Sequence, residues 1–223
     1  MNVRALAGHE EFAEAVRLQR LIWGFEELEL LPVRLFVVAS RIGGQVLGAF
    51  DGERMAGFCL AIPGVKPGGE IYLHSHMLGV LPEWRDAGVG KLLKLEQRRD
   101  ALARGFQLIE WTFDPFEAKN AYFNIESLGA IVPRYVRNMY GVSTSPLHGG
   151  LPTDRCVAQW WIAKSRTKTD VIARVPLPPE KTRASQEWLG SELEGHFDRG
   201  FAITGFERHG DTGTYLLGVW DSR

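Results

Sequence analysis

Apolar residues recur at helical spacing in several stretches of the chain, and shorter apolar runs separate these stretches. In the first stretch, Phe12, Ala15, Leu18 and Ile22 fall on one side of a helix. The same spacing predicts helices over residues 10–23, 32–41, 88–104, 117–128 and 180–198. In the third of these helices we expect the apolar side to consist of Val89, Leu92, Leu93, Leu95 and Leu102.

The shorter runs are rich in β-branched and aromatic residues and are bounded by turn residues. They predict strands over residues 3–6, 45–50, 55–62, 71–80, 108–113, from about 130, 156–163, 201–207 and 213–220. Asp51-Gly52 and His209-Gly210-Asp211 have the composition of hairpin turns. Up to residue 163 the predicted order is β-α-α-β-β-β-α-β-α-β-β, which is a mixed α/β arrangement.

A change of composition near residue 164 predicts two parts. Residues 165–170 are polar and residues 176–179 are proline-rich, which is typical of a joint. We therefore expect a main domain over residues 1–163 and a C-terminal helix–hairpin extension over residues 164–223. The extension is too short for a core of its own, so we expect it to pack on the main sheet or to mediate formation of a homodimer.

Charge and hydropathy exclude several classes of partner. The net charge of −1 and the pI near 6.6 give no electrostatic footprint for nucleic acid. No apolar run approaches the roughly 18–20 residues that cross a bilayer, and charges interrupt the first segment, so we expect a cytoplasmic protein that binds no membrane. Cys59 and Cys156 lie in apolar segments without metal-like spacing, and we interpret both as buried thiols rather than as a disulfide or a nucleophile.

Residues 78–93 carry the strongest chemical signal, because a glycine-bearing turn joins a predicted strand to a predicted helix there. Gly88 and Gly90 lack Cβ atoms, so a ligand can approach their backbone closely. The first amides of the helix have no acceptor within the helix, and the helix dipole is positive at that end. The turn therefore predicts an anion site that suits a diphosphate, to which Arg85 or Lys91 could add charge.

Three nucleotide-binding motifs compete for this turn, and their spacing separates them. The Walker A loop requires Gly-x4-Gly-Lys-Ser/Thr, which the turn lacks, and the dinucleotide fingerprint requires a third glycine where this chain has Leu93. The third motif is Arg/Gln-x-x-Gly-x-Gly/Ala after an apolar strand, and it matches Leu78, Val80, Pro82, Arg85, Gly88, Val89, Gly90 and Leu93. In these residues the chain resembles motif A of the GCN5-related N-acetyltransferase (GNAT) superfamily, with Asp86 where glycine is commoner.

The predicted order of elements strengthens this resemblance over residues 1–163, because it is the order of the GNAT acyl-CoA N-acyltransferase fold. The sequences TFDP, FN and LGA between residues 112 and 130, and PTDR at 152–155, look like the bacterial predicted-acetyltransferase branch. The resemblance implies direct transfer of an acyl group from acetyl-CoA, or another acyl-CoA such as succinyl-CoA, to an amine within a ternary complex. It requires no metal.

The resemblance also implies where the coenzyme binds. The backbone of Leu78 and Val80 would pair with the pantetheine arm, and the pyrophosphate would lie on Arg85, Asp86, Ala87, Gly88, Val89, Gly90 and Lys91. Similar proteins touch the pantetheine with an asparagine from the helix that follows the next strand, which makes Asn120 and Asn124 candidates. Solvation of a helix surface is the alternative role for both asparagines.

Candidates for proton transfer lie on the strands over 71–80 and 108–113. His74 and His76 are two residues apart, so their side chains should share one face, and Glu110 stands on the second strand. In histone acetyltransferases of the superfamily a glutamate base occupies the position of His74, and a histidine can do the same work near neutral pH. The alternative for all three is a hydrogen-bonded structural role, for which Glu110 would need only a partner such as an arginine.

Many GNAT enzymes use a tyrosine to protonate the departing thiolate, and the corresponding position here is Ile125. Tyr122 is a candidate substitute, and solvent is another. The missing tyrosine leaves open a second function, a regulatory module that binds coenzyme A without turnover. A structural or partner-binding protein without nucleotide affinity is a third possibility.

Charged segments near the expected acceptor site favour a small amine, such as an amino acid. Glu26, Glu27 and Glu29 could attract an ammonium group, and arginines can hold a carboxylate through paired hydrogen bonds. The second segment contributes Arg134, Arg137, Asn138, Tyr140 and Arg155. Simple solvation of the surface is the alternative role for these charges.

Overall fold

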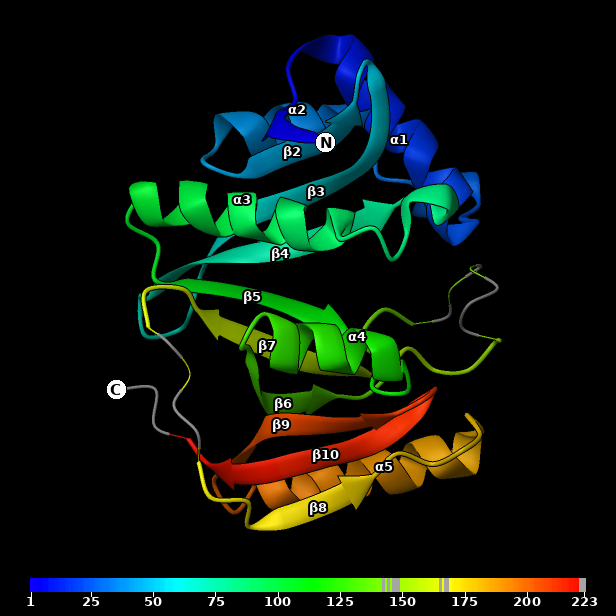
Figure 1. Ribbon diagram of the computed structural model, residues 1–223, viewed down its shortest axis with the longest axis vertical. Coiled ribbons are helices and arrows are strands. Elements are labelled where there is room, and N and C mark those ends of the chain that lie inside the picture. The colour runs from blue at the N-terminus through cyan, green and yellow to red at the C-terminus, as the bar shows by residue number, and fades with distance from the viewer. Residues whose placement is uncertain (142, 144, 146–148, 165, 167–168, 221–223) are drawn as a thin grey trace. The chain divides into compact units, whose positions relative to one another are not determined.

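The computed structural model describes residues 1–141, 143, 145, 149–164, 166 and 169–220. The chain divides into two compact units: unit 1 consists of residues 1–109 and 144–149, and unit 2 of residues 110–143 and 150–223. Figure 1 labels their helices and strands. The domain boundary expected after residue 163 stays a prediction, and part of the polar joint expected over residues 165–170 lies outside the described residues.

Unit 1 contains an antiparallel sheet with the strand order β1-β2-β3-β4. Its strands are β1 (Asn2–Ala5), β2 (Gln45–Asp51), β3 (Arg54–Val65) and β4 (Ile71–Val80). The Asp51-Gly52 turn joins β2 to β3, as expected, with Gly52 at a positive φ of 58°. The chain leaves the sheet at the end of β4 and enters the glycine-bearing turn that precedes α3.

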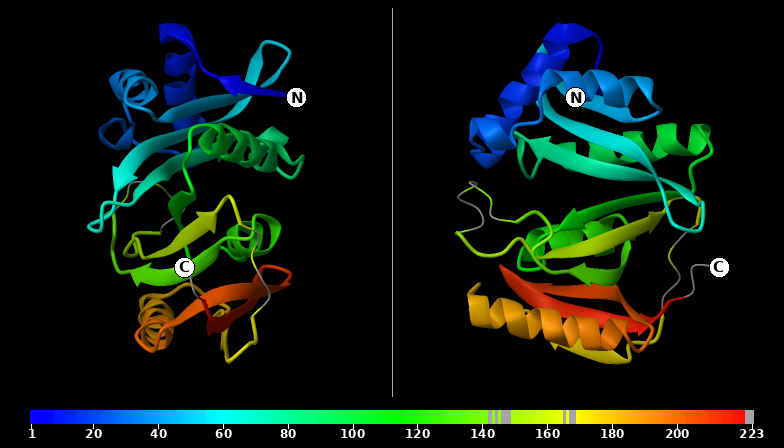
Figure 2. Two further views of the ribbon diagram at one scale, coloured as in Figure 1. Left: turned by 90° about the vertical axis from the view of Figure 1, so that its left-hand side faces the viewer. Right: turned by 180° about the vertical axis from the view of Figure 1, so that it is seen from behind.

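Helices cover both faces of the sheet of unit 1, as the left view of Figure 2 shows. On one face lie α1 (Gly8–Trp23) and α2 (Val33–Arg41), and their core includes Phe12, Leu18, Phe36 and Phe58. On the other face α3 (Val89–Ala103) packs through Val89 and Leu93 against Leu47, Ala49 and Cys59. Alternate residues of β2 thus serve two separate cores, as the period of a strand requires.

The apolar side expected for α3 is wrong in part. Leu92 and Leu95 are 41% and 43% exposed, whereas Lys94 and Gln97 are buried together with Val89, Leu93 and Ala101. The buried stripe follows the spacing 89-93-97-101 along the helix, and Lys94 lies beside it. The polar ends of Lys94 and Gln97 form hydrogen bonds inside the unit, so both side chains can be buried although they are polar.

Unit 2 contains a sheet with the strand order β5-β7-β6-β9-β10-β8. Its strands are β5 (Leu108–Phe113), which begins in unit 1, and β6 (Ile131–Val136), β7 (Arg155–Trp161), β8 (Ala173–Pro176), β9 (Phe201–His209) and β10 (Thr212–Val219). Val132 of β6 pairs with Ile203 of β9, so the C-terminal hairpin extends the sheet of this unit. The edge strand β8 pairs with β10 and was not expected from the sequence.

The helices of unit 2 are α4 (Ala118–Tyr122) and α5 (Arg183–Phe197). The single helix expected over residues 117–128 is instead α4 followed by a π-helical turn, η3 (Phe123–Ser127). α5 begins at a capping box, in which Thr182 Oγ1 accepts from the amide of Ser185 and Ser185 Oγ accepts from the amide of Thr182. Trp188 of this helix is 43% exposed although its side chain is large and apolar.

Candidate functional site

A β-bulge interrupts β4 shortly before the glycine-bearing turn. Leu60 and Ala61 are consecutive on β3, but they face Met77 and Ser75 on β4, so His76 is the extra residue. Before the bulge Ser75 lies on the α3 side of the sheet, next to Cys59. After it Leu78 and Val80 lie on that side. The bulge therefore shifts which positions of β4 face α3.

Asp86 takes an unusual backbone conformation in the turn after β4. A 3-10 turn, η2 (Pro82–Trp84), ends at Arg85, and Asp86 then has a φ of 63°. Aspartate tolerates this left-handed region better than most residues, although glycine adopts it more readily. Asp86 is the position where this chain departs from the commoner glycine of the motif, and its backbone takes a conformation that glycine adopts readily.

The first turn of α3 is open to a ligand. Gly88 is the N-cap residue, with a φ of 79° and no side-chain capping hydrogen bond, and a Cβ built on it would meet nothing within 4 Å. The amide of Leu92 donates to the carbonyl of Gly88, so the helix begins at once. A Cβ on Gly90 would lie 3.9 Å from Leu78 and Val80, which is an ordinary contact distance. The amides at this helix start can thus face an anion.

The two cations expected at the turn are both exposed, and Arg85 has contacts of its own. Its Nε lies 3.4 Å from the carbonyl oxygen of Val80, and its Nη2 lies 3.4 Å from that of Ile22. These long hydrogen bonds leave guanidinium donors for an incoming phosphate. Asp86, Ala87 and Lys91 are also exposed around the turn.

His74 and His76 lie close together on β4. Their ring centroids are 5.9 Å apart, and the ring of Tyr72 lies edge-on to His74 with centroids 6.5 Å apart. The ring contact agrees with the expectation that both side chains share one face. The side chain of His76 is exposed, yet partial desolvation by its surroundings lowers its pKa below the ordinary value. His76 is therefore neutral at pH 7, which is the form that can accept a proton.

A buried polar cluster beneath α3 was not expected from the sequence. Lys94 is 1% exposed, and its Nζ donates to Ser75 Oγ at 2.8 Å and to Gln97 Oε1 at 3.0 Å. Gln97 Nε2 in turn donates to Cys59 Sγ at 3.0 Å, and Gln45 Nε2 donates to the carbonyl of Gln97 at 2.9 Å. Burial lowers the pKa of Lys94 to about 8. The only signal in the sequence is a lysine beside an i, i+4 apolar stripe.

Glu110 has structural partners within unit 2. The side chain is 5% exposed, its Oε2 accepts from Gln159 Nε2 at 3.0 Å, and its Oε1 lies 3.7 Å from Arg134 Nη2. An arginine partner is the condition under which Glu110 needs no catalytic role. A part in proton transfer for Glu110 stays a prediction.

The candidates on the helical segment of unit 2 differ in exposure. Tyr122 is 43% exposed, whereas Ile125 is fully buried within the π-helical turn. Asn120 is exposed. Asn124 is buried, and its Oδ1 accepts from Trp111 Nε1 at 3.2 Å, which gives it a structural role. Asn120 is thus the more accessible of the two asparagines. The π-helical turn itself is of interest because such turns are frequent at functional sites.

The charged residues expected to bind the acceptor have intramolecular contacts. In unit 1, Glu27 pairs with Arg20 at 3.0 Å. In unit 2, Arg137 Nη2 lies 2.7 Å from Glu194 Oε2, the amide of Asn138 donates to Asp154, and Tyr140 contacts Thr112. Arg155 lies 3.9 Å from Asp114, which also pairs with Lys181. Most of these charged residues therefore already have partners within the protein, before any amine substrate binds.

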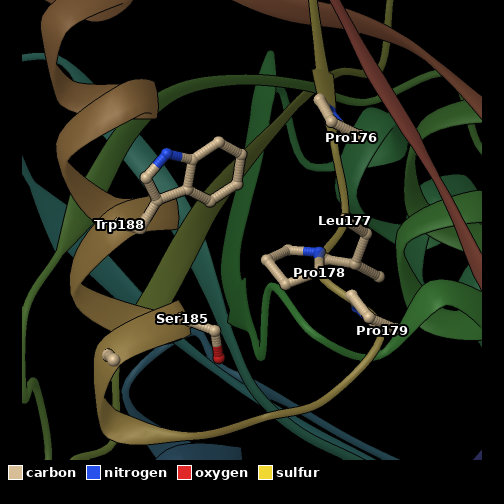
Figure 3. Close-up of a pocket in the computed structure, with 7 residues that line it drawn as sticks. Pro176, Leu177, Pro178, Pro179, Ser185 and Trp188 are labelled. Carbon is tan, nitrogen blue, oxygen red and sulfur yellow. The ribbon is translucent and has the colours of Figure 1, made fainter.

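A shallow hollow of about 500 Å³ lies on unit 2, between the proline-rich segment and α5. Figure 3 shows Pro176, Leu177, Pro178 and Pro179 facing Ser185 and Trp188. None of the described residues that line it can ionise, so it offers no acid, base or metal ligand. Cys59 and Cys156 are free and buried, as expected. Within the described part of the chain, no cluster of three or more His, Cys, Asp or Glu side chains could hold a metal ion.

The described helices are all too short or too polar to cross a membrane. A scan against protein-family models and a search of curated proteins give no match.

A search of solved structures finds GNAT-family acetyltransferases with the same mixed α/β fold. The yncA protein of Salmonella typhimurium, assigned as an acetyltransferase and solved with its cofactor acetyl-CoA, has a TM-score of 0.60 at 16% identity, over 76% of this chain and 98% of its own. The ribosomal-protein-S18-alanine N-acetyltransferase of Escherichia coli has a TM-score of 0.56 at 16% identity, over 77% and 99%. Aminoglycoside 6′-acetyltransferase type Ii has a TM-score of 0.57 at 20% identity, over 73% and 97%. At these identities the likeness establishes the GNAT fold.

Proposed function

We propose that the protein is an N-acyltransferase that moves an acyl group, acetyl by default, from acyl-CoA to an amine. The observation that carries the proposal is the open helix start at Gly88, which follows a bulged strand and a left-handed residue at Asp86. Backbone amides and the helix dipole at such a start bind phosphates. The GNAT fold of its structural neighbours, of which yncA was solved with acetyl-CoA, supports the same conclusion.

The coenzyme would lie along unit 1 in two parts. The backbone of Leu78 and Val80 would pair with the pantetheine, as an added strand does. The turn over residues 85–91 would bind the pyrophosphate through its amides, with Arg85 and Lys91 at its exposed surface. Asn120 of unit 2 is the further candidate for the pantetheine.

Proton transfer would use the histidine pair of β4. The amine acceptor must lose a proton as it attacks the thioester, and a neutral imidazole at His74 or His76 can take it directly or through one water. The lowered pKa of His76 keeps that ring neutral at pH 7. After attack the C–S bond breaks, and the thiolate takes a proton from solvent or from Tyr122, which is exposed. The acyl group passes directly to nitrogen, without an enzyme-bound intermediate.

The acceptor would be a small amine such as an amino acid, and the compartment the cytoplasm. Among the neighbours, one acts on the alanine of a ribosomal protein and another on aminoglycosides, so the fold accepts amines of different size. Buried Ile125, at the position where similar enzymes carry a tyrosine, favours a second candidate function. This is a regulatory module that binds coenzyme A without turnover.

Two measurements test the proposal. Calorimetric titration with acetyl-CoA should give saturable binding, and release of free thiol from acetyl-CoA or succinyl-CoA should depend on an amine from a broad panel. Binding without amine-dependent thiol release would support the regulatory module instead. Absence of any binding would leave the structural or partner-binding function.

Gly90 offers a matched pair of variants for the coenzyme site. Gly90→Ala adds a Cβ at an ordinary distance from Leu78 and Val80, so it should fold and retain binding. Gly90→Trp places a ring at the helix start and should abolish binding of acetyl-CoA while circular dichroism stays that of the wild type. Retention of full affinity in the tryptophan variant would place the coenzyme elsewhere.

The histidines can be separated by single substitutions. His74→Ala and His76→Ala should leave coenzyme binding intact, and the one that removes the base should lower turnover by about 10²–10⁴. His9→Ala, an exposed histidine at the start of α1, is the control and should change neither property. If neither β4 variant lowers turnover, proton transfer does not use these histidines.

A further inference from the structure

The outer side of α2, which faces away from the core of unit 1, is rich in apolar residues for an exposed surface. Its exposed residues follow the spacing i, i+3, i+4, i+7 and i+8, so they form one continuous stripe along the helix. We call this the outer stripe, and it consists of Arg34, Val37, Val38, Arg41 and Ile42. Its three apolar side chains are 37%, 48% and 56% exposed, in chain order.

The helix therefore has apolar residues on two opposite sides. Phe36 and Ala39 are fully buried in the core of unit 1, so the inner side alone holds α2 on the sheet. Exposed valines gain nothing for the helix itself, because β-branched side chains lose rotamer freedom there. A helix that is apolar on both sides is normally covered on both. The outer stripe thus has the character of an interface.

Both charges of α2 are positive, and both belong to the outer stripe. Neither Arg34 nor Arg41 has a side-chain hydrogen bond or an ion pair with another residue that the structure describes. Arg41 lies in the last turn, where the helix dipole favours a cation, but Arg34 lies in the first turn, where the dipole opposes one. A surface that complements the stripe is therefore apolar at its centre and negative at both ends.

A second copy of this chain offers such a surface when its α2 lies antiparallel to the first. The outer stripe is centred on Val38, so a two-fold axis at Val38 places the start of one helix against the end of the other. Val38 then packs on its own copy. Arg34 lies at the end of the partner's helix, where the last carbonyls and the dipole are negative.

The segment before α2 supplies the negative group at the other end. It contains η1 (Glu27–Glu29), in which Leu28 is 98% exposed. Gln19, buried in α1, fixes the short link to α2, because its side chain donates to the carbonyl of Leu31 at 3.1 Å and accepts from the amide of Leu31 at 2.9 Å. In the antiparallel arrangement this segment of one copy faces the C-terminal end of α2 in the other.

Glu27 is the carboxylate that Arg41 of the second copy would meet. The side chain of Glu27 is 89% exposed, and it pairs with Arg20 of its own chain at 3.0 Å. An ion pair as exposed as this contributes little and is readily exchanged for another. Leu28, beside Glu27, would cover Ile42 of the same second copy.

We propose that the protein forms a symmetric homodimer in which the outer stripes of two α2 helices pack antiparallel. The same residues serve on both copies, as an isologous interface requires. Each copy places valines at the centre and an arginine at each end, and arginine is enriched at interfaces of this kind. The inference goes beyond the proposed function and does not depend on it.

The first experiment measures the mass of the intact chain in solution over a range of concentrations, by sedimentation equilibrium. A mass that rises to twice the 25.0 kDa of one chain supports the inference. A mass of 25.0 kDa at every concentration overturns it.

The second experiment places a charge at the centre of the outer stripe. Val38→Glu brings two carboxylates together across the axis and should weaken the dimer about a hundredfold or more. The variant should fold, because the position is exposed and glutamate favours a helix more than valine does. Val65→Glu is the matched control: this valine at the end of β3 is 69% exposed, and its variant should dimerise within twofold of the wild type.

The third experiment tests the symmetry directly. Val38→Glu and Val38→Lys should each be monomeric alone, and an equal mixture of the two should regain the mass of a dimer, because opposite charges then meet across the axis. Arg41→Glu should weaken the dimer about tenfold by repelling the partner's Glu27. Arg99→Glu, at a position on α3 that is 77% exposed, is its control and should leave the dimer unchanged.

Two results would overturn the inference although the wild type dimerises. One is a folded Val38→Glu variant with the affinity of the wild type, which would place the interface on another surface, such as the C-terminal extension. The other is a mixture of the two folded Val38 variants that stays monomeric, because residue 38 would then not face its own copy.

Discussion

The buried lysine of α3 makes a prediction about folding that needs no ligand. The pKa of Lys94 falls from 10.5 to about 8 on folding, mainly through burial. Because the folded-state pKa is the lower one, the unfolded chain binds more protons between pH 8 and 10.5, and the free energy of unfolding rises with pH there. Lys94 therefore destabilises the fold by about 3 kcal/mol at pH 7, and this cost vanishes above the unfolded pKa.

Lys94→Met removes the titrating group and so isolates its contribution to the free energy of unfolding. At pH 7 the variant gains about 3 kcal/mol, but it leaves Ser75 and Gln97 without their donor, which costs about 1–3 kcal/mol for each buried group. The net change at one pH is therefore small and uninformative. The informative quantity is the difference in unfolding free energy between wild type and variant, which should shift by about 2 kcal/mol in favour of the wild type between pH 7 and 9.5.

Urea unfolding curves at several pH values measure this difference. Lys91→Met is the matched control, because it removes an exposed lysine from the same helix and should run parallel to the wild type. Parallel curves for wild type and Lys94→Met across the whole range would refute the reasoning, because Lys94 would then have the same pKa in the folded and unfolded chains.

Three further predictions concern the turn, α5 and the histidines. Asp86→Gly relieves the left-handed φ of 63° and removes an anion beside the proposed phosphate site, so acetyl-CoA should bind several-fold tighter in calorimetry, and weaker binding would argue against a phosphate there. Thr182→Ala removes one half of the capping box of α5 and should lower the unfolding free energy by about 1 kcal/mol, while Thr182→Ser should restore it. If His76 is the base, turnover should fall only below its ordinary pKa near 6.5, because partial desolvation shifts its titration downward; an acid limb above pH 7 would exclude His76.

The glycine-bearing turn could be expected from the sequence because its signal is local. Glycines at fixed spacing between an apolar run and a helix dictate an open helix start, and Gly88 has the expected conformation. The bulge at His76 could not be expected, because it depends on how β4 pairs with β3. It changes the face that Leu78 and Val80 present without any mark in the polar and apolar pattern.

The errors in α3 and α5 have a common cause. Hydropathy selects Leu92, Leu95 and Trp188 as buried residues, yet packing leaves each of them more than two-fifths exposed. Burial of Lys94 depends on Ser75, which is distant in sequence and supplies a partner. A local pattern contains no information about such partners, and this is why the buried cluster, like the partners of Glu110, emerged only from the tertiary structure.

Pairing of β6 with β9 affects how the protein can be shortened. One way to shorten the chain would be to omit the last hairpin, β9 and β10. In unit 2, however, Val132 pairs with Ile203, and Glu126 accepts a hydrogen bond from the amide of Phe206. Removing the hairpin would leave backbone amides and carbonyls of β6 without hydrogen-bond partners at a new sheet edge. Such an edge favours association between molecules. A fragment meant to remain monodisperse should retain residues 201–219.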